Sequence, residues 1–489
     1  MSKVNRFTAV IIGSGFGGQC AAIELARMGI DDFIILERRA FVGGTWAQNT
    51  YPGAAVDVQS PLYSLSFEPY DWSRMFAQRD ELSRYTESIY SKYRLHQKTR
   101  VNQNVKRVEW QETAKQWLIQ TDAGDEFNAQ FVINASGPLS TPIIPKFQDQ
   151  ATFQGATFHT NNWDHSIDLS GKNVAIIGSG ASAAQVIPAI AEHVKALHVF
   201  QRTPHWVLPR WDIVFSPWQR RLLKNRFAYS LVRRLIYWLL EVRILGFKYS
   251  KTLLKLLAAR PAKKHLRRQV PDPELRAKLT PDFTIGCKRI IVSSSLYPAL
   301  GRSNVVLHDK YDSISTFTES GVTTAQGHAV PLDVIIYSTG YDASDGIISY
   351  PVIGKSGRLL SDVWSDFPRA YLGTSVPKFP NFFVVTGPNT GIGHTSALFV
   401  IEAQMAYIRQ SIQAALSSGA SAIEATSEAE NEYTEHIHQE MTKTVWHYGG
   451  CQSWYKSKSG KVTAMFPGFS FTYRRLCRKF KPQHHVFTE

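Results

Sequence analysis

The sequence predicts an α/β protein with two parallel-sheet units, and two glycine-rich turns together with the chain length lead to this class. Residues 13–18 (GSGFGG) stand between an apolar run at 7–12 and a helix-like stretch. Residues 178–183 (GSGASA) repeat this arrangement after an apolar run at 174–177. A chain of 489 residues also exceeds one ordinary core. We therefore expect two Rossmann-like domains and the elements that join them.

The first turn predicts a pyrophosphate site. Gly13, Gly15 and Gly18 allow the backbone to approach the phosphates, and the amides and dipole of the following helix hold their negative charge. The next strand, 33–36, ends in Glu37, and a carboxylate at this place suits the free ribose diol of FAD or NAD. We expect FAD in this domain.

The second turn repeats the first with a different residue beside the ribose. Gly178, Gly180, Ser182 and Ala183 lead into its helix, and the next strand ends at Arg202. Arg202 follows the first glycine of its turn by 24 residues, the same interval as in the first unit. An arginine at this place suits the additional phosphate of NADP. The sequence therefore predicts one flavin and a separate NADPH, with hydride transfer between them.

Three segments divide the chain. Residues 1–150 would form the first part of the FAD domain, 151–330 the NADP domain, and 331–489 the rest of the FAD domain with a C-terminal loop. Beyond the two turns we expect a helix, an antiparallel ribbon, three apolar strands and a late helix, at 80–93, 105–110 with 116–121, 131–134, 333–337, 381–386 and 394–413.

A basic helical insert, about 211–280, interrupts the NADP domain. Between residues 218 and 280 it carries 17 Lys or Arg against three acids, and so accounts for nearly all of the formal charge of +15. Helices are expected at 219–231, 232–249 and 250–259, with breaks at Pro261, Pro271 and Pro273. No uncharged run approaches the roughly 20 residues of a membrane-spanning helix.

Two interpretations of the insert remain open. A basic helical surface with aromatic side chains suits peripheral contact with an anionic membrane surface through 218–280. The alternative is an ordinary helical subdomain with a solvated basic face. Nothing in the chain resembles a dedicated nucleic-acid motif, so no nucleic-acid partner is expected.

The four cysteines, Cys20, Cys287, Cys451 and Cys477, are scattered and show neither C-x-x-C nor metal-ligand spacing. A reducing cytosol and the absence of a metal site are therefore expected. No cysteine pair stands near the first turn, which argues against a disulfide reductase. The first turn begins at residue 13 and leaves no room for a signal peptide, which also favours a cytoplasmic location.

Three motifs resemble the type I Baeyer–Villiger monooxygenases. Residues 153–164 (FQGATFHTNNWD) match the family signature F-x-G-x-x-x-H-x-x-x-W-[P/D] at Phe153, Gly155, His159, Trp163 and Asp164. Residues 44–57 match its [A/G]-G-x-W-x-x-x-x-[F/Y]-P-[G/M]-x-x-x-D pattern, and residues 338–341 resemble its second flavin-domain signature. The resemblance covers nearly the whole chain, from residue 7 to the region of Trp454 and Tyr455.

The resemblance implies a flavoprotein that uses NADPH and O₂ to convert a ketone into an ester or lactone through a C4a-peroxyflavin. The segment 284–290 resembles the part of the family whose arginine lies against the flavin, so Arg289 is expected to stabilise the peroxide and the developing oxyanion. Arginine suits both tasks because it stays charged and offers a planar fork of donors. Asp57 is expected to orient Arg289.

The resemblance also implies further contacts with the two cofactors. The residues expected beside the flavin are Gly44, Thr45, Trp46, Asp57 and Tyr63. Lys288 is expected to join Arg202 and Thr203 on the NADP ribose phosphate, because bidentate arginine contacts suit a dianion. His159 would shape an interdomain hinge without touching substrate. Trp454 would lie on a loop over NADP.

The substrate class stays open at this point. Residues 451–455 and 466–468 look like the family branch acting on aryl ketones, but that branch often has Trp where Phe466 stands. Linear and cyclic ketones are equally open. The same flavin could instead oxidise sulfides or amines, or the chain could be an NADPH-dependent flavin reductase or oxidase that does not oxygenate, or a membrane-docked scaffold with inactive loops. Trp163, Asp164 and Arg289 favour ketone oxygenation.

Overall fold

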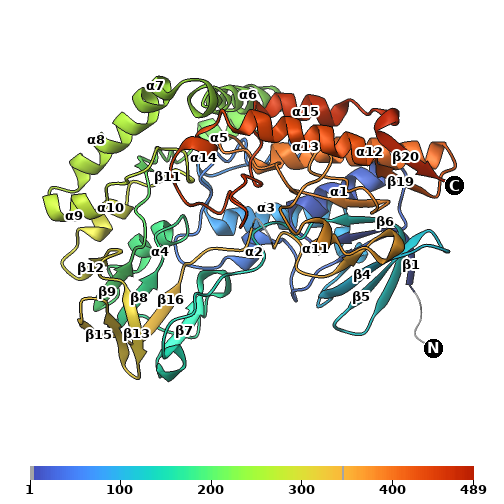
Figure 1. Cartoon of the computed structure of the whole chain (residues 1–489). Helices are drawn as coiled ribbons and strands as arrows, with labels where there is room; N and C mark the ends of the chain where they lie inside the picture. The colour runs from blue at the N-terminus through green and yellow to red at the C-terminus, as the bar shows by residue number, and fades with distance from the viewer. Residues whose placement is uncertain (1–4, 344–345) are drawn as a thin grey trace.

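The computed structural model describes residues 5–343 and 346–489, and two large sheets lie side by side beneath a layer of helices (Figure 1). The expected α/β class with two Rossmann-like units is therefore confirmed. Within the described ranges, no helix combines the length and the apolar character needed to cross a membrane.

The first sheet takes strands from both halves of the chain, in the order β17-β4-β5-β6-β1-β2-β3, with β18 beside β6. Its strands are β1 (Asn5–Ile12), β2 (Phe33–Leu36), β3 (Thr99–Arg100), β4 (Val105–Gln111), β5 (Gln116–Thr121), β6 (Glu126–Asn134), β17 (Val352–Ile353) and β18 (Phe382–Val384). The core strands run parallel, while β5 lies antiparallel to both β4 and β6.

The two faces of this sheet's central strand pack against different elements. Ile11 of β1 shares a buried cluster with α1 (Phe16–Arg27) and α12 (Ala397–Ser417), whereas its neighbour Val10 shares a cluster with β4 and β5. Burial on both faces explains why β1 and β2 are continuous apolar runs rather than alternating ones.

The second sheet is entirely parallel, in the order β12-β9-β8-β16-β7. Its strands are β7 (Ala156–His159), β8 (Asn173–Ile177), β9 (Ala196–Phe200), β12 (Val305–His308) and β16 (Val334–Tyr337). The helices α4 (Ala183–Ile190) and α10 (Leu296–Leu300) pack on one face. A small antiparallel sheet covers the other, formed by β13 (Ile314–Thr318), β14 (Gly321–Thr324) and β15 (Ala329–Pro331).

The boundary between the NADP domain and the second part of the FAD domain lies later in the chain than expected, because β16 belongs to the second sheet. It pairs with both β7 and β8, so the chain leaves the second sheet after Tyr337 and not at residue 331. The apolar run identifies a buried strand but not the sheet that it joins, because pairing partners are distant in sequence.

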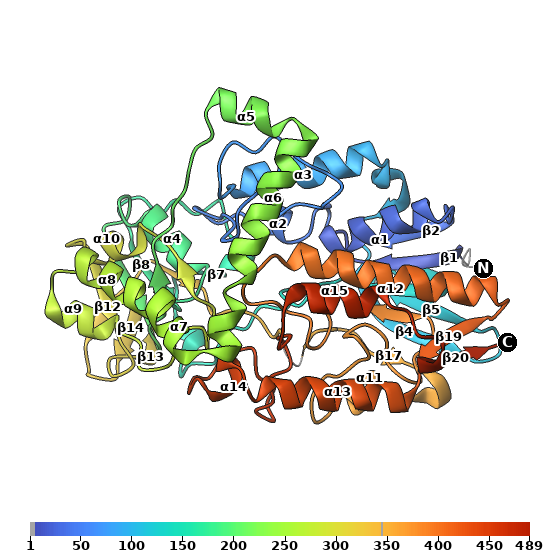
Figure 2. The same ribbon diagram turned by 90° about the horizontal axis from the view of Figure 1, so that it is seen from above.

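The insert lies between β10 (Val207–Leu208) and β11 (Ile291–Val292). It contains α5 (Pro217–Leu223), α6 (Arg226–Glu241), α7 (Lys251–Leu254), α8 (Arg260–Gln269) and α9 (Pro273–Lys278), with π-helical segments η4 (Leu245–Tyr249) and η5 (Lys255–Ala259). Seen from above, α6 runs between the two sheet units (Figure 2).

Several expected boundaries in the insert are wrong, including the break between residues 231 and 232, which falls inside α6. The helix expected at 219–231 is interrupted at Asn225, whose side chain accepts hydrogen bonds from the amides of Phe227 and Ala228 and so caps α6. Pro261 does not break a helix, because the backbone stays helical from α7 through the π-helical segment η5 into α8, and Pro261 is the second residue of α8.

The remaining elements are short or lie near the C-terminus. They are α2 (Thr45–Gln48), α3 (Arg79–Lys92), α11 (Leu360–Val363), α13 (Ser427–Met441), α14 (Val445–Tyr448) and α15 (Ser470–Arg478), with β19 (Ala422–Ala425) paired to β20 (His485–Thr488). In both views α12 and α15 lie alongside each other over the first sheet (Figures 1 and 2).

Candidate active site

The first glycine turn is a tight cradle between β1 and α1. Gly13 has φ +104°, and a Cβ there would lie 2.5 Å from the carbonyl oxygen of Ala135. A Cβ on Gly18 would lie 1.9 Å from the carbonyl oxygen of Gly13. Gly15 lies against Gly44, whose own Cβ would lie 2.6 Å from the Gly15 Cα. Backbone atoms therefore line this turn, as a pyrophosphate site requires.

Glu37 lies directly beside this turn. Its carboxylate accepts hydrogen bonds from the Ser14 amide at 3.1 Å, the Ser14 hydroxyl at 2.6 Å and the Arg39 amide at 2.9 Å. The side chain is buried and is held in one orientation. Each carboxylate oxygen has two lone pairs, so the group retains acceptor capacity for a ribose hydroxyl.

The second turn is more open. Gly178 has φ +120°, and a Cβ there would lie 2.2 Å from the carbonyl oxygen of Ser338. Gly180 has free space around it. Ala183 begins α4 and is buried at the place where the first turn has Gly18, so this helix stands further from its strand. Ser182 immediately precedes α4.

Cations gather beside the second turn. The Ser179 hydroxyl donates to the carbonyl oxygen of Thr203 at 2.9 Å, which ties the turn to the end of β9. Arg202 is exposed, and the described residues supply it with no hydrogen bond or ion pair. Burial and the nearby charge of Arg202 lower the pKa of Lys288. Two neighbouring cations of this kind suit a multiply charged anion.

Arg289 and Asp57 form a bidentate ion pair although 232 residues separate them. The guanidinium donates to the two carboxylate oxygens at 2.7 and 2.5 Å, and Asp57 raises the pKa of Arg289 above its already high value. Lys288 and Arg289 are adjacent in sequence but act at different places. Lys288 lies near Arg202 of the second unit, and Arg289 binds Asp57 on the segment that follows α2.

Aromatic side chains surround this ion pair. The Trp46 indole donates to the Tyr63 hydroxyl at 3.2 Å, and burial raises the pKa of Tyr63 to about 12. Burial likewise raises the pKa of Tyr455 to about 12, with Arg289 and Asp57 acting on it in opposite directions. The expected residues Trp46, Asp57, Tyr63 and Arg289 therefore lie together. Tyr455 belongs to this cluster and was not among the site residues expected from the sequence.

The segment that carries Asp57 is held by the second unit. The Tyr51 hydroxyl donates to the Gln185 side chain of α4 at 3.0 Å, and the Gln185 amide donates to the carbonyl oxygen of Ala55 at 2.9 Å. Gly53 also packs on α4, since a Cβ there would lie 2.5 Å from the Gln185 carbonyl oxygen. The Asp57–Arg289 pair consequently lies where the two units meet.

His159 lies at this junction and not beside the ion pair. Its Nδ1 accepts from the Asn161 amide at 3.0 Å, and burial lowers its pKa to about 4. The Tyr341 ring stands 5.8 Å from the imidazole, and the Tyr341 hydroxyl donates to Asn161 and to Asn49. This network joins the signature segment to the region of Thr45.

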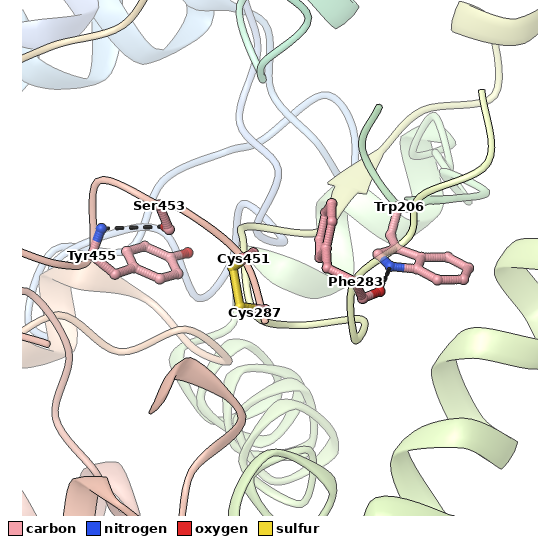
Figure 3. The surroundings of a disulfide bond; sticks show 6 residues. All are labelled: Trp206, Phe283, Cys287, Cys451, Ser453 and Tyr455. Atoms are coloured by element: carbon pink, nitrogen blue, oxygen red, sulfur yellow. Dashed lines mark hydrogen bonds between the residues drawn. A yellow bond between two sulfur atoms is a disulfide. The ribbon is translucent and has the colours of Figure 1, made fainter. Parts of the chain in front are cut away.

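A disulfide joins Cys287 to Cys451, with Tyr455 on one side and Phe283 on the other (Figure 3). The expectation of scattered, reduced thiols is therefore wrong for these two residues, because sequence spacing does not reveal contacts across 164 residues. Cys20 and Cys477 are free and buried. The bond ties the segment carrying Lys288 and Arg289 to the C-terminal loop carrying Tyr455.

Metal-ligand geometry is not found in the described part of the chain, where no group of three or more His, Cys, Asp or Glu could hold an ion.

Trp454 is partly exposed and stacks edge-on to Tyr455 at 4.6 Å between ring centres. The C-terminal loop is docked by Asn389, whose side chain donates to the carbonyl oxygens of Val462 and Met465 at 3.0 Å.

Comparisons with known proteins agree with this geometry. Residues 10–232 match a family model described as pyridine nucleotide-disulphide oxidoreductase; both cysteines of the disulfide lie outside this range. A Baeyer–Villiger monooxygenase from Pseudomonas aeruginosa is 42% identical over 98% of this chain and 91% of its own length. One from Streptomyces coelicolor is 40% identical over 96% of this chain and 90% of its own.

Solved structures give the same result. A steroid monooxygenase bound to NADP has a TM-score of 0.89 and 29% identity, covering 99% of this chain and 100% of that one. A cyclohexanone monooxygenase from a Rhodococcus species, bound to NADP⁺, has a TM-score of 0.90 and 27% identity over the full length of both chains. The resemblance found in the sequence is thus confirmed, and the chain belongs to the Baeyer–Villiger monooxygenase family.

Proposed function

We propose that this member of the family uses NADPH and O₂ to insert oxygen beside the carbonyl of a lipophilic small-molecule ketone, with FAD at the first turn and NADPH at the second. The observation that carries the proposal is the Asp57–Arg289 pair, which lies where the two units meet and is bidentate. A fixed cation at that junction is what a reaction developing negative charge on a carbonyl oxygen requires.

The residues of the first turn fit a flavin dinucleotide. The cradle around Gly13 and Gly18 has no space for a Cβ, so phosphates would meet only backbone amides. Glu37 would accept a ribose hydroxyl, and Thr45, Trp46 and Tyr63 would approach the ring system. When bound and reduced, the flavin supplies the electrons that activate dioxygen.

The second unit would hold the reductant. Arg202, Lys288 and Thr203 would bind the ribose phosphate that distinguishes NADPH from NADH, since both cations lie beside the turn and Arg202 makes no ion pair with the described residues. Gly178, Gly180, Ser182 and Ala183 would contact the pyrophosphate. The same two cations would be poorly compensated without an anionic ligand.

Arg289 would act on the substrate rather than on the dinucleotide phosphates. Its guanidinium stays charged at every relevant pH and offers donors that Asp57 does not use. Asp57 orients the group by occupying its Nε and one terminal nitrogen. Burial keeps Tyr63 and Tyr455 protonated at neutral pH, so the cluster contributes no second negative charge.

The test is the product formed for each NADPH consumed, measured with linear, cyclic and aryl ketones. Arg289→Ala is expected to bind FAD and to be reduced by NADPH, but to lose ester formation by about 100-fold or more. Arg302→Ala, which removes a surface arginine paired with Glu192 at 2.9 Å, is the matched control. Full ester yield from Arg289→Ala would contradict the assigned role.

The products also distinguish the competing reactions. Sulfide or amine oxidation without ester would indicate the related flavin chemistry, and peroxide release without any oxygenated product would indicate an oxidase. We also propose peripheral contact with an anionic membrane through 218–280.

A further inference from the structure

We propose that the outward face of α6, with α5 beside it, docks on an anionic lipid bilayer. This surface, called here the docking face, is independent of which ketone the enzyme oxidises. It is built from apolar side chains that the fold leaves in solvent, namely Trp218, Leu222, Phe227, Leu231, Leu235, Trp238, Leu239 and Val242.

The spacing of these residues makes α6 apolar on its exposed side. Phe227, Leu231, Leu235, Leu239 and Val242 recur every three or four residues and therefore share one face. Phe227 is 79% exposed and Leu239 is 73% exposed, values that belong to side chains with almost no protein neighbours. A surface helix normally presents polar residues there, and contiguous exposed apolar side chains mark interaction sites.

The orientation of this face is fixed by what α6 buries. Tyr229, Ile236 and Leu240 are buried on the opposite side of the helix. Arg233 donates to the carbonyl oxygen of Pro61 at 2.8 Å, and the Tyr229 hydroxyl lies 3.0 Å from the Ser64 hydroxyl. The helix therefore cannot rotate its apolar side inward without losing these contacts.

The docking face extends beyond α6. Trp218 on α5 is 67% exposed, and the Trp238 ring lies 6.0 Å from Phe471 of α15. In the view from above, α5, α6 and α15 all lie toward the viewer's side of the molecule, with α6 lengthwise across it (Figure 2). A helix that lies lengthwise with an apolar side outward has the geometry of interfacial helices.

Basic residues predominate around this face, and Asp71 is an acid beside it. Arg221, Lys224, Arg226 and Arg234 are exposed on α5, α6 and their junction, and Arg243 is exposed just after α6. The acid of α6, Glu241, is buried and accepts hydrogen bonds from the amide and hydroxyl of Ser470 at 2.5 and 2.6 Å. Lys224 also lies 3.3 Å from Asp71, which Arg220 holds as well.

This charge pattern favours an anionic membrane over a second copy of the chain as the partner of the docking face. Anionic headgroups attract a cationic rim while acyl chains receive the apolar side chains, and Trp is enriched at that interface. A second copy of the chain would set the same arginines against each other across an isologous contact. The contacts of Arg233 and Tyr229 place the docking face directly behind residues 61–64, which include Tyr63 of the active site.

The experiment is cosedimentation of the FAD-loaded enzyme with vesicles of phosphatidylcholine alone or mixed with phosphatidylglycerol. Binding is expected to the mixed vesicles and to fall with salt. Phe227→Ser combined with Leu239→Ser should weaken it by about tenfold or more. Arg226→Gln combined with Arg234→Gln should weaken it by about tenfold at low salt.

The matched control is Tyr311→Ser combined with Leu416→Ser, which removes two exposed apolar side chains elsewhere (69% and 45% exposed). Control and wild-type binding should agree, and ketone turnover in solution should be equal in all variants, which separates this test from the proposed reaction. No binding at low salt, or equal binding by the Phe227/Leu239 variant, would overturn the proposal. A concentration-dependent dimer that this variant abolishes would overturn it in favour of self-association.

Discussion

The two glycine turns share one plan but differ in how tightly they are built. In the first, a Cβ on Gly18 would lie 1.9 Å from a backbone oxygen, whereas the second places Ala183 at the matching position. Glu37 is buried and accepts three hydrogen bonds, while Arg202 is exposed and makes no ion pair with the described residues. The first turn is therefore tightly packed beside a buried carboxylate, whereas the second leaves Arg202 exposed beside it.

This difference suits two ligands with different lifetimes on the protein. A flavin that remains bound through many turnovers gains from a rigid cradle, because preorganisation lowers the cost of binding. A nicotinamide cofactor that exchanges in every cycle needs an accessible site. Substitutions in the two units should therefore have different consequences.

Adding a methyl group to each turn should separate the two units most clearly. Gly18→Ala is expected to lose FAD and to destabilise the fold by about 3 kcal/mol or more, because the turn must open. Gly180→Ala should keep both FAD content and melting temperature, since nothing lies near its Cβ. Flavin absorbance per protein and thermal unfolding measure the two effects. Equal behaviour of the variants would remove the contrast.

Cleaving the Cys287–Cys451 disulfide should have the next largest effect. Because it closes a long loop, its loss is expected to cost about 2–5 kcal/mol of unfolding free energy. Cys451→Ser and wild type treated with reductant should melt alike, below the untreated protein. Cys477→Ser, at a buried free thiol, serves as the comparison for loss of a cysteine. An unchanged melting temperature on reduction would show that the bond does not stabilise the fold.

Removing Arg202, the exposed cation of the second unit, should weaken the use of NADPH and leave FAD binding unchanged. Arg202→Ala is expected to raise the KM for NADPH by about 10- to 100-fold, the value of a charge-assisted contact, and to change that for NADH little. FAD content should not change, since Glu37 serves the other turn. Steady-state kinetics with both nucleotides provide the measurement. A parallel rise in both KM values would argue against phosphate recognition.

Mild acid should act on the second unit and its junction more than on the first unit. Of the four described histidines whose pKa burial lowers to about 4, three lie there, and the fourth, His485, contacts Tyr407 of α12. Burial lowers the pKa of His159, His198 and His205 to about 4, below the ordinary 6.5. As the pH falls below about 6.5 the unfolded chain takes up protons that the folded chain does not, so stability declines by about 2 kcal/mol per histidine by pH 5. Urea unfolding at pH 7 and pH 5 measures this loss. In His159→Asn the decline should be smaller, and an identical decline would exclude His159 as a contributor.

The sequence was most informative where structure depends on near neighbours. Strand 33–36 and the ribbon strand 116–121 have the bounds expected from their apolar patterns. The insert was harder, because Asn225 can be helical or can cap a helix, and only the packing of Tyr229 and Ile236 selects the cap. The apolar pattern at 333–337 predicted a strand but could not predict which sheet it joins, because its pairing partners are distant in the sequence.

The candidate site also combines residues that local spacing predicts with residues that depend on distant contacts. The turn glycines and the residues beside the ribose follow from local spacing, and only the family resemblance implied that Arg289 meets Asp57. The part played by Tyr455 and the disulfide had no local signal, since both depend on the C-terminal loop returning to the segment at 284–290.

Local sequence patterns were enough to establish the α/β class, the two glycine turns, the acidic and basic residues that follow the second strand of each unit, and the family. These features depend on residues close together in the chain, where steric limits and apolar periodicity act directly. Only the tertiary structure decided that Cys287 pairs with Cys451, that β16 joins the second sheet and that α6 turns apolar side chains to solvent. Such features depend on which distant segments pack together and exclude water, and local sequence patterns do not predict that packing.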